Sequence, residues 1–203
     1  MNQLENIENW LKIGKDEAED LIDLPWKVTL QEDGWLIAEH PKVPFTLFIG
    51  MDEQFIHFFV FSGIETALLE PTDRLSIYRE LLLLNNEVNL MKFVIEGTDE
   101  EIALKLDLDI ANITKEEVDD ALMALLTGLY IMVKALEIEE DFNEEIKNRT
   151  YLVLKEKIDK GAKEEDLIEF LNKKMGISKK EAKRIIDEIL KTMKKTRYIK
   201  GYA

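Results

Sequence analysis

The sequence predicts an α+β fold for residues 1–140, in which an antiparallel sheet has its helices on one face, followed by a small all-helical C-terminal domain. Three observations predict this fold. Apolar spacing follows the order helix, four strands, helix, two strands and helix along the first 140 residues. The segment 101–110 alternates strictly between apolar and polar side chains, which is typical of a strand with one buried and one solvated face. Beyond residue 150 the apolar spacing is helical to the end.

The N-terminal part begins with helical spacing and then changes to strands. Leu4, Ile7 and Leu11 recur at helical intervals, and a second short helix is expected over 16–24, before Pro25. Strands are expected over 26–30, 35–40, 45–50 and 54–62. Because the last of these strands is apolar on both faces, we expect it near the centre of the sheet.

A helix then runs directly into a strand, with no proline between them. We expect this helix to be capped by Thr72 or Asp73 and to end at Asn85 and Asn86. Its predicted apolar stripe consists of Leu75, Tyr78, Leu81 and Leu82. Asparagine tolerates left-handed backbone geometry and can end a helix with side-chain hydrogen bonds, so the two asparagines are expected to allow this tight junction.

A second hairpin and a long helix complete the predicted α+β domain. The hairpin joins the strands "LMKFVIEG" and "EIALKLDLDI". A capping box, Thr114 with Glu117, opens a helix that is expected to run to about residue 139. Leu126 and Tyr130 widen its apolar stripe beyond what one sheet face normally needs.

The composition limits the class of protein. Cysteine is absent, which excludes disulfides, thiolate metal sites and cysteine nucleophiles. No apolar run is long enough to span a bilayer, and the first residues are polar and acidic, unlike a signal peptide. We therefore expect a cytoplasmic protein. The charged fraction of 34%, rich in Glu and Lys, is typical of a thermophilic source.

The net charge of −15 is distributed unevenly along the chain. Residues 1–150 carry 12 basic and 33 acidic side chains, whereas residues 151–203 carry 15 basic and 9 acidic ones. The first part is therefore strongly acidic and the second basic. Together with the apolar spacing, this change in charge along the chain predicts an α+β domain over 1–140, an acidic linker over 141–150 and a basic three-helix domain over 151–203.

The order of elements resembles that of a known superfamily. The junction "LLLLNNEVNLMKFVIEG", the strand "EIALKLDLDI" and the helix start "TKEEVDDALMALL" are similar to the YbjN and type III secretion (Tir/CesT) chaperone-like superfamily, over roughly residues 1–140. The resemblance implies a small acidic α+β protein, often dimeric, that holds a segment of another protein against its surface. It implies no catalytic residues and no cofactor. Since the basic C-terminal domain is absent from the secretion chaperones, we expect a general chaperone- or adaptor-like role.

The C-terminal domain has the pattern of a short helix, a turn and a basic helix, as in a helix-turn-helix. In a major groove, the first residues of the basic helix would lie nearest the bases; these include Lys179, Lys180, Lys183 and Arg184. Lysine is a poor reader of bases, however, and lysine-rich helices are common on solvated surfaces. Nucleic-acid binding therefore stands beside two alternatives, a helical protein-interaction domain and packing against the acidic domain.

Few side chains suggest catalysis or metal binding. Asp107 and Asp109 point the same way on one strand and could share Mg²⁺, but Lys105 lies on that face and alternation already explains all three. His57 alternates with phenylalanines and His40 precedes a proline in a loop. No phosphate-binding glycine loop occurs. We predict a protein that is not an enzyme and has no metal or cofactor.

Apolar side chains exceed what one core requires. Aromatic residues are expected on both faces of the sheet, and a contiguous exposed apolar patch usually marks a binding site. We predict an interface with a protein or peptide partner, or with a second copy in a homodimer, formed by Phe48, Phe58, Leu126 and Tyr130. The alternative is a regulator that binds DNA through the C-terminal domain.

Overall fold

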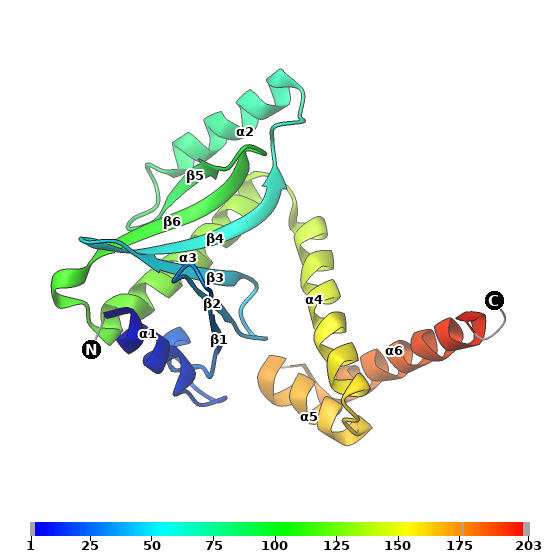
Figure 1. Cartoon of the computed structure of the whole chain (residues 1–203). Coiled ribbons are helices and arrows are strands. Elements are labelled where there is room, and N and C mark those ends of the chain that lie inside the picture. The colour runs from blue at the N-terminus through cyan, green and yellow to red at the C-terminus, as the bar shows by residue number, and fades with distance from the viewer. Residues whose placement is uncertain (1–2, 176, 201–203) are drawn as a thin grey trace. The chain divides into compact units, whose positions relative to one another are not determined.

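The computed structural model describes residues 3–175 and 177–200. The chain divides into two compact units, Met1–Glu139 (unit 1) and Glu140–Ala203 (unit 2). Unit 1 contains a six-stranded antiparallel sheet with helices, and unit 2 is helical (Figure 1). The predicted α+β fold is confirmed.

The sheet of unit 1 has the strand order β1-β2-β3-β4-β6-β5. Its strands are β1 (Lys27–Leu30), β2 (Leu36–Glu39), β3 (Thr46–Met51), β4 (Phe55–Glu65), β5 (Lys92–Glu96) and β6 (Glu101–Asp109). Its helices are α1 (Gln3–Lys12), α2 (Pro71–Leu84) and α3 (Lys115–Ala135), with short 3₁₀ turns η1 (Leu21–Asp23) and η2 (Ile110–Asn112). The apolar strand β4 lies between β3 and β6, which confirms its predicted central position.

The core of unit 1 lies between the sheet and α3. The capping box of Thr114 and Glu117 is formed, and it starts α3 where the sequence predicts. Gly128 of α3 sits so close to Leu104 of β6 that an added Cβ would lie 3.2 Å from the leucine side chain. The core face of the sheet is therefore the one that carries Leu104. In Figure 1 the strands pass in front of α3.

The predicted second helix over 16–24 is wrong. Only η1, at Leu21–Asp23, is helical in this segment. The backbone instead bonds across to the end of α1, because Trp26 N–H donates to the Leu11 carbonyl at 2.9 Å and Lys15 N–H to the Asp23 carbonyl at 2.7 Å. Gly14 permits this approach, since a Cβ there would lie 2.3 Å from the Leu24 carbonyl carbon.

Helix α2 begins and packs differently from the prediction. Its N-cap is Glu70, and Pro71 takes the first helical position, where a missing N–H costs nothing. Leu81 and Leu84 are buried, but two residues of the predicted stripe are not: Leu75 is 68% exposed and Leu82 is 67% exposed. The run of four leucines makes more than one side of this helix apolar, so the spacing alone does not identify the packed side.

The junction after α2 depends on the side chain of one asparagine. Asn85 Oδ1 accepts from Phe93 N–H at 2.8 Å, and Asn85 Nδ2 donates to the Phe93 carbonyl at 3.1 Å. Asn85 itself is right-handed, with φ −60°, and Leu90 adopts the left-handed conformation, with φ 67°. The predicted role of Asn85 in a left-handed turn is therefore wrong, whereas its side-chain bonding is confirmed.

A hydrogen-bonded cluster attaches α2 to the turn between β5 and β6. The hydroxyl of Tyr78 donates to Glu100 Oε2 at 2.7 Å and lies 2.5 Å from the hydroxyl of Thr66. Arg74 Nη1 donates to the same Glu100 oxygen at 3.0 Å. The hydrogen bond from Tyr78, followed by the charge of Arg74, lowers the pKa of Glu100 below its usual value.

We expect this cluster to make stability depend on pH. A carboxyl group whose pKa is lowered by folding stabilises the protein above its unfolded pKa, and this contribution is lost as the pH falls through the folded pKa. The wild type should therefore exceed Glu100→Gln in Tm at pH 7, and the difference should shrink below about pH 4. Glu87→Gln removes one surface carboxylate as a control. A Tm difference between the wild type and Glu100→Gln that is the same at pH 7 and pH 3 would contradict the expectation.

Unit 2 contains α4 (Glu139–Asp159), α5 (Glu164–Met175) and α6 (Lys179–Lys200). Its core is formed by Leu154, Leu167, Leu171, Ala182, Ile186 and Ile189. The segment 141–150 was predicted as a linker, but it is part of helix α4. Gly161, with φ 87°, follows the end of α4 as predicted, whereas the predicted cap at Gly176 lies outside the described residues. Across the described parts of both units, no helix has the length and apolar character needed to cross a membrane.

Candidate functional site

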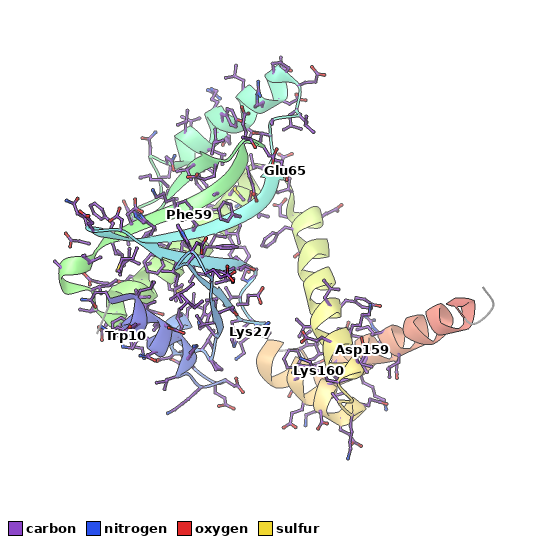
Figure 2. The ribbon with its side chains drawn as sticks, in the orientation of Figure 1. Trp10, Lys27, Phe59, Glu65, Asp159 and Lys160 are labelled. Carbon is purple, nitrogen blue, oxygen red and sulfur yellow. The ribbon has the colours of Figure 1, made fainter. Side chains whose placement is uncertain are left out.

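The face of the sheet opposite α3 carries a cluster of aromatic side chains. We call this side the open face. Because side chains alternate along a strand, it bears Phe59 and Phe61 of β4 and Phe48 of β3, whereas Phe58 points to the core (Figure 2 labels Phe59). The Phe48 and Phe61 rings meet edge to face with centroids 5.2 Å apart, and Phe59 stacks on Phe61 at 6.0 Å. Rings in these arrangements attract each other beyond their burial.

Trp35 extends the cluster toward β2. Its ring centroid lies 5.8 Å from that of Phe59. Gly50 of β3 makes room for it, since a Cβ at Gly50 would lie 2.7 Å from the indole. The indole therefore lies over the backbone of β3, where any larger residue would displace it.

The strand register shows that the open face extends across four strands. Ile37 of β2 pairs with Phe48, Phe48 with Phe59, and Phe59 with Lys105 of β6. On the next row, Phe61 pairs with Ala103. Within the described residues of unit 1, the helices pack on the other face of the sheet. On the open face, the side chain of Phe61 remains 38% exposed to solvent. This side of the sheet is thus an apolar surface in contact with solvent.

A network of charged side chains borders the aromatic cluster. His57 Nδ1 lies 2.6 Å from Asp107 Oδ1, and His57 Nε2 lies 3.0 Å from Asp52 Oδ2. Lys105 lies 3.5 Å from the other oxygen of Asp107 and 5.3 Å from the centre of the Phe59 ring. The network links the turn between β3 and β4 to the last half of β6.

The network consists of hydrogen bonds to carboxylates, with the ammonium group of Lys105 beside Asp107. Backbone N–H groups of Gln54 and Phe55 donate to Asp52, each at 2.7 Å, and lower the pKa of Asp52 below its usual value. His57 can donate to both carboxylates only when both ring nitrogens carry a proton, and it then has no lone pair with which to act as a base. Within the described residues, no group of three carboxylates, histidines or cysteines is placed to hold a metal ion.

The four predicted interface residues do not form one surface. Phe58 is fully buried in the core, so its predicted place in an interface is wrong. Phe48 belongs to the open face, where it packs against Phe61. Leu126 is half-buried on α3 and Tyr130 is 53% exposed on the same helix, on the other side of the sheet from Phe48.

Sequence reasoning missed how His57, Asp107 and Asp52 come together. His57 and Asp107 are directly opposite in the register of β4 and β6, fifty positions apart in the chain. The alternation of β6 indicates that Asp107 faces solvent, but it does not indicate which residue of β4 lies opposite Asp107. Asp52 gave a local signal, because an aspartate in a turn often accepts from the backbone N–H group two residues further on.

In unit 2 the predicted basic residues lie at the start of α6. Lys179, Lys180, Lys183 and Arg184 are all exposed, and Arg184 donates to Glu181 at 2.5 Å. Ser178 accepts from Glu181 N–H at 3.3 Å, as expected for the predicted cap. The opposite side of α6, with Ala182 and Ile186, belongs to the core of unit 2.

The fold and the open face define a two-unit α+β protein with an apolar sheet surface. Residues 6–136 match the family described as "Domain of unknown function (DUF8183)", and the chain belongs to that family. Residues 137–203 match a second family, HTH_78, described as "Domain of unknown function". A solved structure of an uncharacterized protein from Methanothermobacter thermautotrophicus is similar, with 11% identity and a TM-score of 0.47, over 68% of this chain and 97% of that one. No curated protein matches the sequence. The resemblance to the YbjN and type III secretion chaperone-like superfamily stays a prediction.

Proposed function

We propose that this protein is a non-catalytic binding protein, of a chaperone- or adaptor-like kind, that holds a segment of another protein on the open face of its sheet. The observation that carries the proposal is the aromatic cluster of Trp35, Phe48, Phe59 and Phe61. Contiguous apolar surface in contact with water usually marks an interaction site. Aromatic side chains also dominate the energetics of protein interfaces.

Two further features support a binding role. Residues 1–139 carry 29 acidic and 10 basic side chains, a charge that favours solubility of a protein with apolar surface. The histidine nearest the cluster, His57, is engaged by carboxylates on both ring nitrogens, an arrangement suited to holding a surface in place.

We also propose that the protein acts in the cytoplasm and forms a homodimer through the outer side of α3, where Met123 and Tyr130 are exposed.

Substitution on the open face should abolish partner binding. We expect the proteins that co-purify with the tagged chain from its own cells to fall at least about tenfold for Phe61→Ser, since loss of a central aromatic residue commonly costs more than 1 kcal/mol. Quantitative mass spectrometry measures the change. Leu75→Ser is the matched control, because it removes an exposed apolar side chain from α2. Equal retention by both variants would remove the open face as the binding surface.

Nucleic-acid binding by unit 2 is a second candidate function. Two observations favour it: the exposed basic residues at the start of α6, and the helix-turn-helix label of the family that matches residues 137–203. In a helix-turn-helix protein the second helix enters the major groove with its N-terminal residues against the bases. This role is compatible with partner binding by unit 1.

Fluorescence anisotropy with a generic DNA duplex tests this candidate. If α6 contacts phosphates, the affinity should fall steeply between 50 and 200 mM salt, on the order of tenfold or more. Lys180→Glu with Lys183→Glu should weaken it by a similar factor. The control pair, Lys155→Glu on α4 with Lys160→Glu just after this helix, should change it less. Binding that the two pairs of substitutions weaken equally would argue for non-specific attraction.

A further inference from the structure

The aromatic cluster of the open face is bordered by carboxylates at both ends of the strands. On β6 the open-face residues run from Asp107 through Lys105 and Ala103 to Glu101. Glu101 pairs on one side with Glu65 at the end of β4 and on the other side with Glu96 of β5, so three glutamates share one row (Figure 2 labels Glu65). Asp107 and Asp52 lie at the other end, beside His57.

The two ends differ in how far their charge is neutralised. The ammonium group of Lys105 lies 3.5 Å from Asp107, so part of the negative charge there is already paired. In the glutamate row, Glu101 accepts from the backbone N–H of Gly63 at 2.8 Å, and this bond brings no positive charge. Like charges directly opposite each other in a sheet are unfavourable. A positively charged group on the occupant of this face would relieve that repulsion.

The geometry of the face favours a helix as its occupant. A side-chain surface gives an extended peptide no backbone partners for the hydrogen bonds that it would lose to water, whereas a helix satisfies its own backbone. The opposite face of this sheet is covered in that way by α3. Asp107 and Glu101 are six positions apart on β6, which is about 20 Å along the strand. A helix spans that distance in about 14 residues.

We infer that the open face takes an amphipathic helix of another protein, with an apolar stripe of about four turns and Lys or Arg at both ends of that stripe. The inference rests on the proposed binding function and adds the chemistry of the partner. The aromatic cluster would bury the stripe, and the glutamate row would pair with the basic residues at one end. The charge requirement should be strongest at this row, because the other end is partly neutralised.

Labelled helical peptides test the inference by fluorescence anisotropy with the full chain. The probes are three 16-residue peptides that share the same apolar stripe. They differ only in the pair of residues at each end of the stripe, which is Lys in the first peptide, Gln in the second and Glu in the third. We expect the Lys peptide to bind at least about tenfold more tightly than the Glu peptide at 50 mM salt, and the difference to narrow at 500 mM. Glu65→Gln with Glu96→Gln should reduce the preference about threefold, whereas Glu80→Gln with Glu87→Gln removes the same charge elsewhere and should preserve it.

Each other outcome has a definite meaning. Equal binding of the Lys and Glu peptides, lost for Phe61→Ser, overturns the charge inference and leaves the proposed function standing. Absence of peptide binding, with a two-chain mass in light scattering that becomes one-chain for Phe61→Ser, assigns the face to a second copy and overturns the inference. Absence of peptide binding, with a mass that Phe61→Ser leaves unchanged and no partner lost in the co-purification experiment, overturns both proposals.

Discussion

Replacing Phe58 by alanine is expected to lower the free energy of unfolding by about 3–5 kcal/mol, the range for a fully buried phenylalanine. Phe58 is completely shielded in the middle of β4, and it pairs with Ile49 of β3 and Leu106 of β6. Truncation would leave a cavity beneath α3 that rigid neighbouring strands cannot close. Urea or thermal denaturation followed by circular dichroism measures the loss.

Phe61→Ala provides the matched control in the same strand. Phe61 lies three residues away on the open face and is 38% exposed, so its truncation should cost distinctly less stability. The two variants therefore separate core packing from surface packing with one residue type. Equal losses for Phe58→Ala and Phe61→Ala would mean that the open face is covered as fully as the core.

Replacing Gly14 by alanine is expected to destabilise unit 1 by about 3 kcal/mol, at the upper end of typical overpacking costs. The new Cβ would lie 2.3 Å from the Leu24 carbonyl carbon and 2.5 Å from the Asp23 carbonyl oxygen. Both are backbone atoms, which cannot move aside as a flexible side chain can. The segment around η1 would have to separate from α1, with loss of the hydrogen bond from Lys15 N–H to Asp23.

Ile13→Ala is the control for this substitution. Ile13 precedes Gly14 and is 76% exposed, so its truncation should change the Tm by little. Hydrogen exchange gives a second measurement, because Gly14→Ala should raise exchange at Trp26, whose N–H donates to the Leu11 carbonyl. A Gly14→Ala variant as stable as Ile13→Ala would show that the two segments can move apart at little cost.

The sequence predicts those elements of the fold whose signals are local. The alternation in β6 and the capping box of Thr114 and Glu117 each lie within a few residues, and both match the structure. The phase of β4 is different, because phenylalanines occupy both of its faces. Phe58 and Phe59 are equally apolar, and only the packing of α3 decides which one is buried.

The other features that the sequence did not predict also depend on contacts between distant segments. Leu75 and Leu82 match a helical stripe, but α2 is oriented by the contacts of Tyr78 with Thr66 and Glu100, which belong to distant segments. The pairing of His57 with Asp107 likewise depends on strand register across fifty positions. Signals of this kind arise only when the chain is folded, so neither hydrophobic period nor local propensity contains them.

The insertion of β6 between β4 and β5 has a consequence for the order in which the chain folds during synthesis. Strands β1 to β4 pair in sequence order and can associate once residue 65 has left the ribosome. At that stage β4, the most apolar strand, is an unpaired edge, and its second neighbour is completed only at Asp109. The nascent chain therefore passes through a period of exposure to aggregation, and fast translation between these two points should favour correct closure of the sheet.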